Sequence, residues 1–470
     1  METRLEQWAA SVMAFALELA LTTLAGCATE ERSPSLSQPL SVSHAAPLGA
    51  FDGGLDASAD AGDDARVGPA VADAFILDLA MFTFERRPCS CCWGLDSMFV
   101  NGPPLPWVER SPDLLGGQVY HPDEALTQFF GRSPTSMAVL LGFSYAIGQD
   151  GTGLAGWAPI TVEDQHGVAE RLNAELGGEH VLVVPSVMPN DRIDLQLARM
   201  ERLAAAGDVV AWQLTPGWGP GTAPLPEGHW LDDDVGLRTI DKGIELGVAV
   251  FLVDKGWNRP IYSPTYVDPI DVGRVAKRFA EARFVVLHAA SELPQREAPE
   301  AQADEVDAGA DAPTAPEPEP LWREGPYQEL VDVPYPTDRG IDRLIRSLRD
   351  NGIGPNENVY ASLNGVWAHV MEYPEEAAHV LGKLLLHIGE DNVLWASEGL
   401  IYGGPAPQIA AFMDFQIPAE LRAAHGYPEL TPQRKIKILG ANAARLLGVD
   451  PLPPPVLAEA DLDASVGGDE

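Results

Sequence analysis

Basic residues are scarce in this chain, and their scarcity excludes one class of function and disfavours another. Among 470 residues there are 31 Lys and Arg against 69 Asp and Glu, a formal net charge of −38 at pH 7. Proteins that hold nucleic acid or anionic lipid rely on basic side chains, so the composition excludes a nucleic-acid surface and disfavours a basic patch that binds anionic lipid. The first predicted strand, Ala74–Met81, is not followed by Gly-x-Gly-x-x-Gly. The sequence also has no Gly-x-x-x-x-Gly-Lys-Ser/Thr loop. Dinucleotide and phosphate loops of these kinds are therefore unsupported.

The N-terminal apolar stretch is short and ends in small residues, which is typical of a signal peptide and not of a membrane-spanning helix. It closes on Leu24-Ala25-Gly26-Cys27. These four residues resemble a bacterial lipobox, and the resemblance implies that residues 1–27 are a lipoprotein-type signal peptide, cleaved before Cys27, and that Cys27 is lipidated. We therefore expect an exported lipoprotein, anchored to a membrane by lipid alone, in the bacterial outer membrane or periplasm. The alternative is an amphipathic helix of a cytosolic protein with an incidental cysteine.

Three segments lack the apolar side chains needed to offset chain entropy, so we expect them to be disordered. Residues 28–70 are rich in Ser, Pro, Ala, Gly and Asp, and form a predicted tether. Residues 292–322 are acidic and Pro-rich, and read as an insertion within the folded region. The tail at residues 451–470 begins with a Pro-rich run and continues as an acidic one.

The remaining residues, 71–450, alternate apolar runs with amphipathic segments. Eight runs are nearly continuous and suit strands buried on both faces of a parallel sheet: Ala74–Met81, Ser136–Phe143, His180–Pro185, Val209–Leu214, Gly247–Val253, Phe284–His288, Asn358–Leu363 and Asn392–Ser397. Predicted helices lie between them, for example at Gly340–Asn351 and Pro374–Ile388. Eight strand–helix alternations predict an α/β fold, a (β/α)8 TIM barrel, with a doubly wound open sheet as the alternative.

Four stretches of the chain resemble the amidohydrolase-related (amidohydrolase 2 type) family of the metal-dependent amidohydrolase superfamily. They are residues 230–256, 284–292, 358–404 and 426–451, the last containing the closing helix around Asn442-Ala443-Ala444-Arg445-Leu446. The resemblance implies a TIM barrel whose metal ligands lie at the carboxyl ends of the strands. It also implies hydrolase or decarboxylase chemistry on a small carbonyl or carboxylate substrate.

The ligand positions of this family are altered here. No histidine occurs between positions 44 and 121, so the first strand has no imidazole to offer. Asp254 stands where the family has a histidine before Lys-Gly, His288 matches a family histidine, and Glu398 occupies an acidic position. The resemblance thus implies catalysis by Asp254, His288 and Glu398, with metal ligands drawn from Asp78, Asp254, His288 and Glu398. A divalent cation (Zn, Mn or Mg) is expected there, or none. Without a metal, the expectation is general acid–base catalysis by the paired carboxylates.

Each of these residues also has a structural interpretation. His288 suits a hydrogen-bonded core histidine, and Asp78 suits a structural role at a strand end. Asp254 is a candidate for a salt bridge with Lys255 or Arg259. Glu398 is a candidate for capping the helix that follows it.

Three of the four cysteines, Cys89, Cys91 and Cys92, cluster in the loop after the first predicted strand. In an oxidising compartment two of them are able to form a disulfide, which leaves one thiol over. Thiolates also bind soft metals, but the spacing is a weak metal motif. A loop without metal is the favoured interpretation.

Two functions follow from these observations. The first is a divergent metal-dependent hydrolase or decarboxylase with an altered metal site. The second is a catalytically inactive, surface-anchored lipoprotein that uses the barrel mouth as a binding pocket. In both, the expected partner is a small molecule, and the oligomeric state is left open.

Overall fold

Short apolar segments form parallel strands, as the sequence predicts. The computed structural model describes residues 74–83, 121–142, 162–207, 209–217, 228–256, 263, 265–291 and 340–457. The predicted signal peptide, tether, cysteine cluster and acidic insertion lie outside the described residues, as do residues 458–470 of the tail. Residues 451–457 follow the last helix as irregular chain.

The described strands pair only in parallel and in sequence order. They are β1 (Leu77–Met81), β2 (Met137–Leu141), β3 (Val181–Val184), β4 (Ser186–Val187), β5 (Trp212–Leu214), β6 (Val250–Asp254), β7 (Arg283–Leu287), β8 (Val359–Ser362) and β9 (Val393–Leu394). β3 and β4 are separated by Pro185 alone, so together they form one strand of the barrel. Each of the eight predicted apolar runs therefore overlaps one strand of the barrel, with β3 and β4 counted together.

The sheet closes between its first and last strands. The Leu79 backbone N–H donates to the Trp395 carbonyl over 3.2 Å, and Met81 makes a parallel bridge with Gly399. A doubly wound open sheet has no such closing contact, because its two outermost strands are edges. The fold is thus a (β/α)8 barrel, and the open-sheet alternative is wrong.

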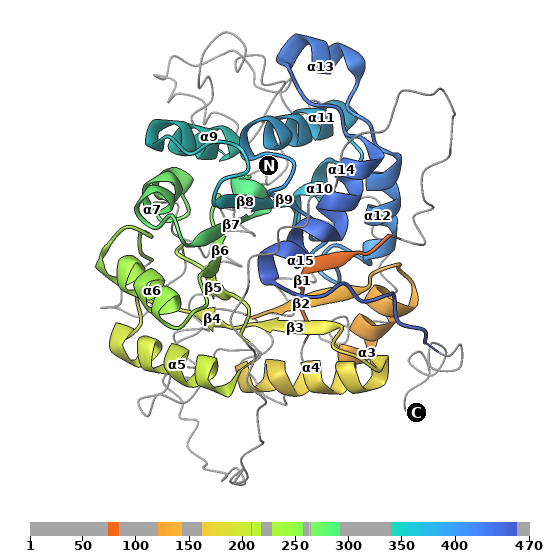
Figure 1. Cartoon of the computed structure of the whole chain (residues 1–470). Helices are drawn as coiled ribbons and strands as arrows, with labels where there is room; N and C mark the ends of the chain where they lie inside the picture. Colours follow the sequence, from red (N-terminus) through yellow and green to blue (C-terminus); the bar gives the residue numbers. More distant parts are fainter. Residues whose placement is uncertain are drawn as a thin grey trace, which may run out of the picture. The chain divides into compact units, whose positions relative to one another are not determined.

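Helices surround the strands: Figure 1 shows α5, α6 and α7 on the left, α9 and α11 above, α12 and α14 on the right and α4 below. The main helices between strands of the barrel are α4 (Val162–Leu176), α5 (Ile193–Ala206), α6 (Asp234–Glu245), α7 (Val272–Arg278), α9 (Gly340–Asn351), α11 (Pro374–Lys383) and α12 (Pro405–Asp414). Shorter elements complete the described set: α3 (Pro122–Ala125), α10 (Val366–Val370), α13 (Ala419–His425), α14 (Pro432–Ile436) and α15 (Asn442–Leu447). None of the described helices combines the length and the apolarity that a bilayer span requires.

Local sequence explains where the helices begin. The Asp233 side chain accepts a hydrogen bond from the Gly236 N–H at 2.9 Å and caps α6. Thr431 caps α14 in the same way, and α11 begins with Pro374, whose missing N–H has no partner to lose in a first turn. These caps fix the entry of each helix onto the barrel.

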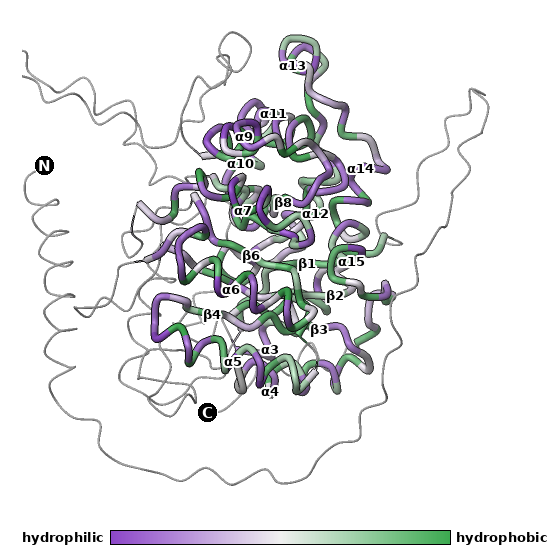
Figure 2. Tube along the Cα trace, turned by 60° about the vertical axis from the view of Figure 1, so that its left-hand side comes forward, coloured by the Kyte–Doolittle hydropathy of each residue, from purple (hydrophilic) through white to green (hydrophobic). Residues whose placement is uncertain are grey.

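The core has an inner and an outer part, because side chains on a strand alternate between faces. On β6, Phe251 and Val253 pack outward with the helices, whereas Leu252 belongs to a second cluster, which includes the barrel interior and also residues of α4 and α15. Figure 2 shows apolar residues concentrated along the strands, while α9 on the outside is largely polar. The same alternation places Asp254 on the barrel side and Lys255 on the helix side.

Candidate active site at the carboxyl ends of the strands

Two of the predicted acidic residues, Asp254 and Glu398, continue the inward face of their strands at the carboxyl end of the barrel. Asp254 is the last residue of β6 and continues the inward series of Leu252. Glu398 lies shortly after β9 and continues the inward series of Leu394 and Ala396. The side chains of both carboxylates are buried, with 9% exposed for Asp254 and 3% for Glu398. The barrel thus brings both acids to its carboxyl end, where active sites of this fold lie.

His288 reaches the same place through an unusual backbone. It follows β7 directly, and the residues His288, Ala289 and Ala290 have φ values of 56°, 51° and 60°. Glu398 and Leu400 are also left-handed, with φ values of 52° and 73°. Residues with side chains adopt this region at a cost of about 1–3 kcal/mol each, and such strain clusters at functional sites. The strain here falls on the segments that carry His288 and Glu398.

The three side chains meet around the imidazole ring. His288 Nε2 lies 3.6 Å from Asp254 Oδ1, and His288 Nδ1 lies 3.6 Å from Glu398 Oε2. A buried imidazole thus has a carboxylate near each ring nitrogen. The structure therefore brings together three of the four residues that the sequence singled out.

Asn364, which follows β8, holds the His288 ring and was missed by the sequence analysis. Its backbone carbonyl lies 2.9 Å from His288 Nδ1, and its side-chain Oδ1 accepts from the His288 backbone N–H at 2.9 Å. Ser362 Oγ donates to the same Oδ1 at 2.5 Å. A carbonyl oxygen only accepts, so a proton on Nδ1 suits this contact, whereas the Asn364 amide nitrogen, which only donates, lies 3.0 Å from Nδ1 and 3.3 Å from Nε2. The available signal was a pair of polar residues, Ser362 and Asn364, at a strand end.

Asp78 has a different position, at the seam where the barrel closes. Its side chain is fully buried, and its Oδ1 accepts from the backbone N–H groups of Ser397 at 3.0 Å and Ala80 at 3.1 Å. Its Oδ2 lies 3.2 Å from the same Ser397 nitrogen. Burial raises the pKa of Asp78 to about 6, against the lowering effect of these hydrogen bonds. Asp78 therefore holds the turn that carries Glu398.

Two structural interpretations of the acidic residues are wrong. Lys255 does not pair with Asp254, because it extends to the helix side and binds Asp271 Oδ2 at 2.7 Å. Glu398 does not cap α12, because this helix begins after Gly404 without a side-chain cap. Arg259 lies outside the described residues.

The donor set supports a divalent cation only in part. Nε2 of His288 lies near the Asp254 carboxylate, and its Nδ1 lies 2.9 Å from a backbone carbonyl, a second contact that many metal-binding histidines also make. A catalytic zinc site takes three protein ligands. Within the described ranges, no three His, Cys, Asp or Glu residues are arranged to hold a metal ion. The residues in place therefore do not by themselves complete a metal site.

Comparison with known proteins yields structural likeness only. No family model matches this sequence, and no curated protein does. Among solved structures, the chain is similar to an uncharacterized TIM-barrel protein, Bb4693, from Bordetella bronchiseptica (15% identity, 79% of this chain, 98% of that chain, TM-score 0.46). It is also similar to Metarhizium anisopliae IDCase in apo form (13%, 80% and 97%, 0.39) and to amidohydrolase 2 from Bifidobacterium longum subsp. infantis (12%, 80% and 100%, 0.36). At such identities and TM-scores, the fold rests on this chain's own strand order and closure.

Proposed function

We propose that this protein is a divergent hydrolase or decarboxylase of the amidohydrolase superfamily that acts on a small carbonyl or carboxylate substrate. The observation that carries the proposal is the buried imidazole of His288, which lies 3.6 Å from Asp254 on one side and 3.6 Å from Glu398 on the other. A histidine between two carboxylates at the mouth of a barrel is suited to proton transfer.

In hydrolysis, His288 Nε2 takes a proton from water as the water oxygen bonds to the substrate carbonyl carbon. The Asp254 carboxylate beside Nε2 stabilises the imidazolium that forms. The bond to the leaving group then breaks, and that group receives a proton from the imidazolium or from protonated Glu398. General acid–base catalysis of this kind contributes about 10²–10⁴-fold in rate. In decarboxylation, the same groups return a proton to the carbon that has lost carbon dioxide.

The structure offers a matched control for the role of His288. His180 is also buried, with 6% exposed, and its Nδ1 also lies near a backbone carbonyl, that of Ser136 at 2.7 Å. It precedes β3, however, at the opposite end of the barrel. His180→Gln therefore changes a buried histidine of the same kind far from the proposed chemistry.

The test measures turnover of esters, lactones and carboxylated aromatics by the wild type, His288→Gln and His180→Gln. We expect kcat to fall by about 10²–10⁴-fold in His288→Gln and to stay within about twofold in His180→Gln, with circular dichroism showing that both variants fold. No turnover of any substrate, together with saturable binding of one of them, would overturn the proposal. That outcome favours a catalytically inactive pocket protein.

The role of a metal is tested separately by elemental analysis of the purified chain. About one equivalent of Zn, Mn or Mg, with turnover lost on chelation and restored by that ion, supports metal-assisted hydrolysis. If turnover survives chelation and the metal content is far below one equivalent, the result supports general acid–base catalysis by Asp254, His288 and Glu398 alone.

We further propose that the chain is exported and held at a membrane by lipid on Cys27. The support is the short apolar run that ends in Leu24-Ala25-Gly26-Cys27. Incorporation of labelled fatty acid into the wild type and its absence from Cys27→Ser would support this. Equal labelling of the two proteins would contradict it.

A further inference from the structure

Lys255, the residue after Asp254, makes its contacts outside the barrel interior. Asp254 and Lys255 are neighbours, so their side chains leave β6 on opposite faces. Asp254 faces His288 inside the barrel, whereas Lys255 extends into the layer between β6 and the helices. Whatever fixes Lys255 therefore also fixes the backbone from which Asp254 projects.

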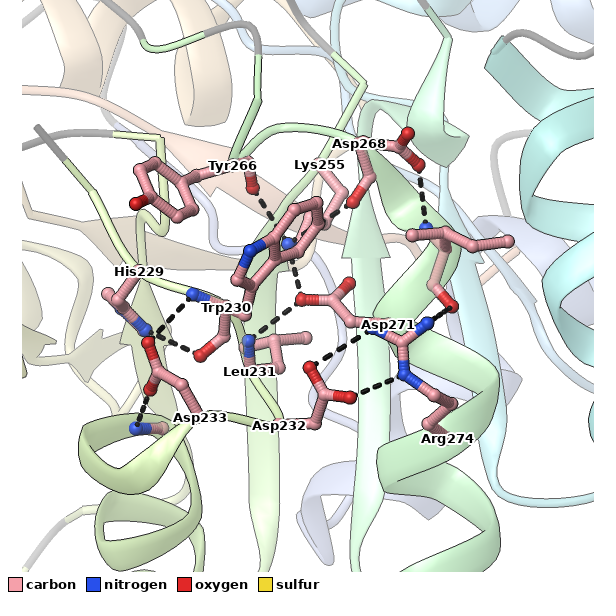
Figure 3. A network of polar contacts seen from close by, with 12 residues as sticks. His229, Trp230, Leu231, Asp232, Asp233, Lys255, Tyr266, Asp268, Asp271 and Arg274 are labelled. Carbon is pink, nitrogen blue, oxygen red and sulfur yellow. Dashed lines mark hydrogen bonds and ion pairs between the residues drawn. The ribbon is translucent and has the colours of Figure 1, made fainter.

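Lys255 is held on every side. Its side chain is fully buried, and Nζ donates to Asp271 Oδ2 at 2.7 Å and to the backbone carbonyls of Tyr266 at 2.7 Å and Asp268 at 3.3 Å. An ammonium group has three hydrogens, so these acceptors use all of them. The Trp230 ring lies 5.3 Å from Nζ, within the range of a cation–π contact. Figure 3 shows Lys255 and Asp271 at the centre of this network.

Asp271 connects Lys255 to a second loop. Its carboxylate is also fully buried, and Oδ2 accepts from the backbone N–H of Leu231 at 2.7 Å. Leu231 precedes α6, and Asp271 precedes α7. The ion pair thus joins the end of β6 to the starts of two helices, as Figure 3 shows.

The residue after Lys255 contacts the strained segment of His288. Gly256 has a φ of 89°, and its N–H donates to the Val267 carbonyl at 2.6 Å. A Cβ at this position would lie 1.9 Å from the Ala290 carbonyl oxygen. The backbone beyond β6 therefore packs directly against the His288–Ala290 turn. A shift of Lys255 would change the spacing between Asp254 and His288.

We propose that Lys255 and Asp271 form a positioning pair, which holds the Asp254 carboxylate at its distance from His288. This inference rests on the proposed function and assigns the pair no contact with substrate. Buried ion pairs are often no more stabilising than apolar residues of similar volume, so stability alone is a weak reason for placing one here. Geometric specificity at the neighbouring carboxylate is the role that we assign to it.

The chain contains a second buried pair of the same kind, which serves as the control. Lys383 Nζ binds Asp342 Oδ1, and both side chains are fully buried between α11 and α9. This pair joins two helices and is not adjacent to a residue of the proposed site. The test compares Lys255→Met/Asp271→Leu with Lys383→Met/Asp342→Leu, because removing both charges avoids leaving one of them buried alone.

We expect the Lys255/Asp271 variant to fold, to lose at least tenfold in kcat with KM within about threefold, and to change the shape of the pH–rate profile. The Lys383/Asp342 variant should keep its kcat within twofold and its pH profile unchanged. Equal losses in both variants, or a wild-type kcat and profile in the first, would overturn the proposal. If a double variant does not fold, Lys255→Met/Asp271→Asn and Lys383→Met/Asp342→Asn, which also leave no charge buried alone, replace the two and are judged by the same criteria.

A second measurement keeps this inference separate from the proposed function. The ¹⁵N ring resonances of His288, assigned by their absence from His288→Gln, report the surroundings of the imidazole without any substrate. We expect them to move in the Lys255/Asp271 variant and not in the Lys383/Asp342 variant. Unmoved resonances would refute the positioning role even in an active enzyme. Moved resonances in a chain without turnover would retain the positioning role and reject the proposed chemistry.

Discussion

Replacing Asp78 with Asn should remove one cause of the decrease in unfolding free energy that the wild type shows as the pH rises. Burial raises the pKa of Asp78 from its ordinary value of 3.8 to about 6. A carboxyl whose pKa is raised by folding favours the folded state while it is protonated, and this contribution is lost as the pH rises through the folded pKa. At about 1.36 kcal/mol per pKa unit, the full loss above pH 6 is about 3 kcal/mol.

Only part of this loss of unfolding free energy is measurable, because the chain has an isoelectric point near 4.4 and is best studied above pH 5. At pH 5 about half of the loss has already occurred, which leaves about 1.4 kcal/mol between pH 5 and pH 8. Asp78→Asn keeps the oxygen that accepts from Ser397 and Ala80, and its amide does not titrate in this range. The difference in unfolding free energy, variant minus wild type, should therefore rise by about 1.4 kcal/mol from pH 5 to pH 8.

The measurement is urea unfolding at several pH values, followed by circular dichroism. Taking the difference between two proteins cancels the other titrating groups. Asp241→Asn, which removes a carboxyl at an exposed position of α6, is measured in parallel as the control. A difference for Asp78→Asn that is flat within 0.5 kcal/mol, or that falls with pH, would refute the account of Asp78 as a carboxyl made costly by burial.

Two further substitutions test the geometry around His288. Asn364→Ala removes the acceptor of the His288 backbone N–H. We expect the free energy of unfolding in urea to fall by about 2 kcal/mol and kcat to fall at least tenfold. Unchanged values would contradict the role of Asn364. Gly256→Ala should cost more than about 3 kcal/mol, because its Cβ would strike the Ala290 carbonyl. Gly426→Ala, with a φ of 69° and open space around its Cβ, should cost about 1 kcal/mol, and equal costs for the two glycines would rule out the clash.

The barrel was predictable because its strands are buried on both faces. Such strands appear as nearly continuous apolar runs, and eight of these in order leave few alternatives. Closure was not predictable from the same signal, because an open sheet has strands of the same composition. The closing contact between Leu79 and Trp395 depends on how the strands tilt and stagger around the barrel.

The two acidic residues of the site were predicted from the family resemblance, and the alternation of the strands explains why they reach the site. Asp254 and Glu398 lie at strand ends in phase with inward residues, so the alternation of the strand already aims them at the mouth. The same alternation points Lys255 outward and argues against the expected pair with Asp254. That error came from considering proximity along the chain without the direction of the side chains.

The position of His288 follows from neither periodicity nor composition. In the outward and inward series of β7, Val286 packs outward and Leu287 inward, so residue 288 would face the helices if the strand continued. The left-handed backbone from His288 to Ala290 ends the strand and redirects the ring toward Asp254 and Glu398. Alanine has no intrinsic preference for this conformation, and three such residues in a row need the surrounding structure to impose it.

The contacts around this turn show how it is imposed. Asn364, from β8, holds the backbone and ring of His288, and Gly256, from β6, packs against Ala290. Both neighbours of β7 in the sheet thus contribute to a single strained turn. A core histidine that only fills space needs no such arrangement, since an extended strand would bury it at no conformational cost. The strain is therefore best understood as the cost of holding an imidazole between two carboxylates, which is the geometry that the proposed chemistry requires.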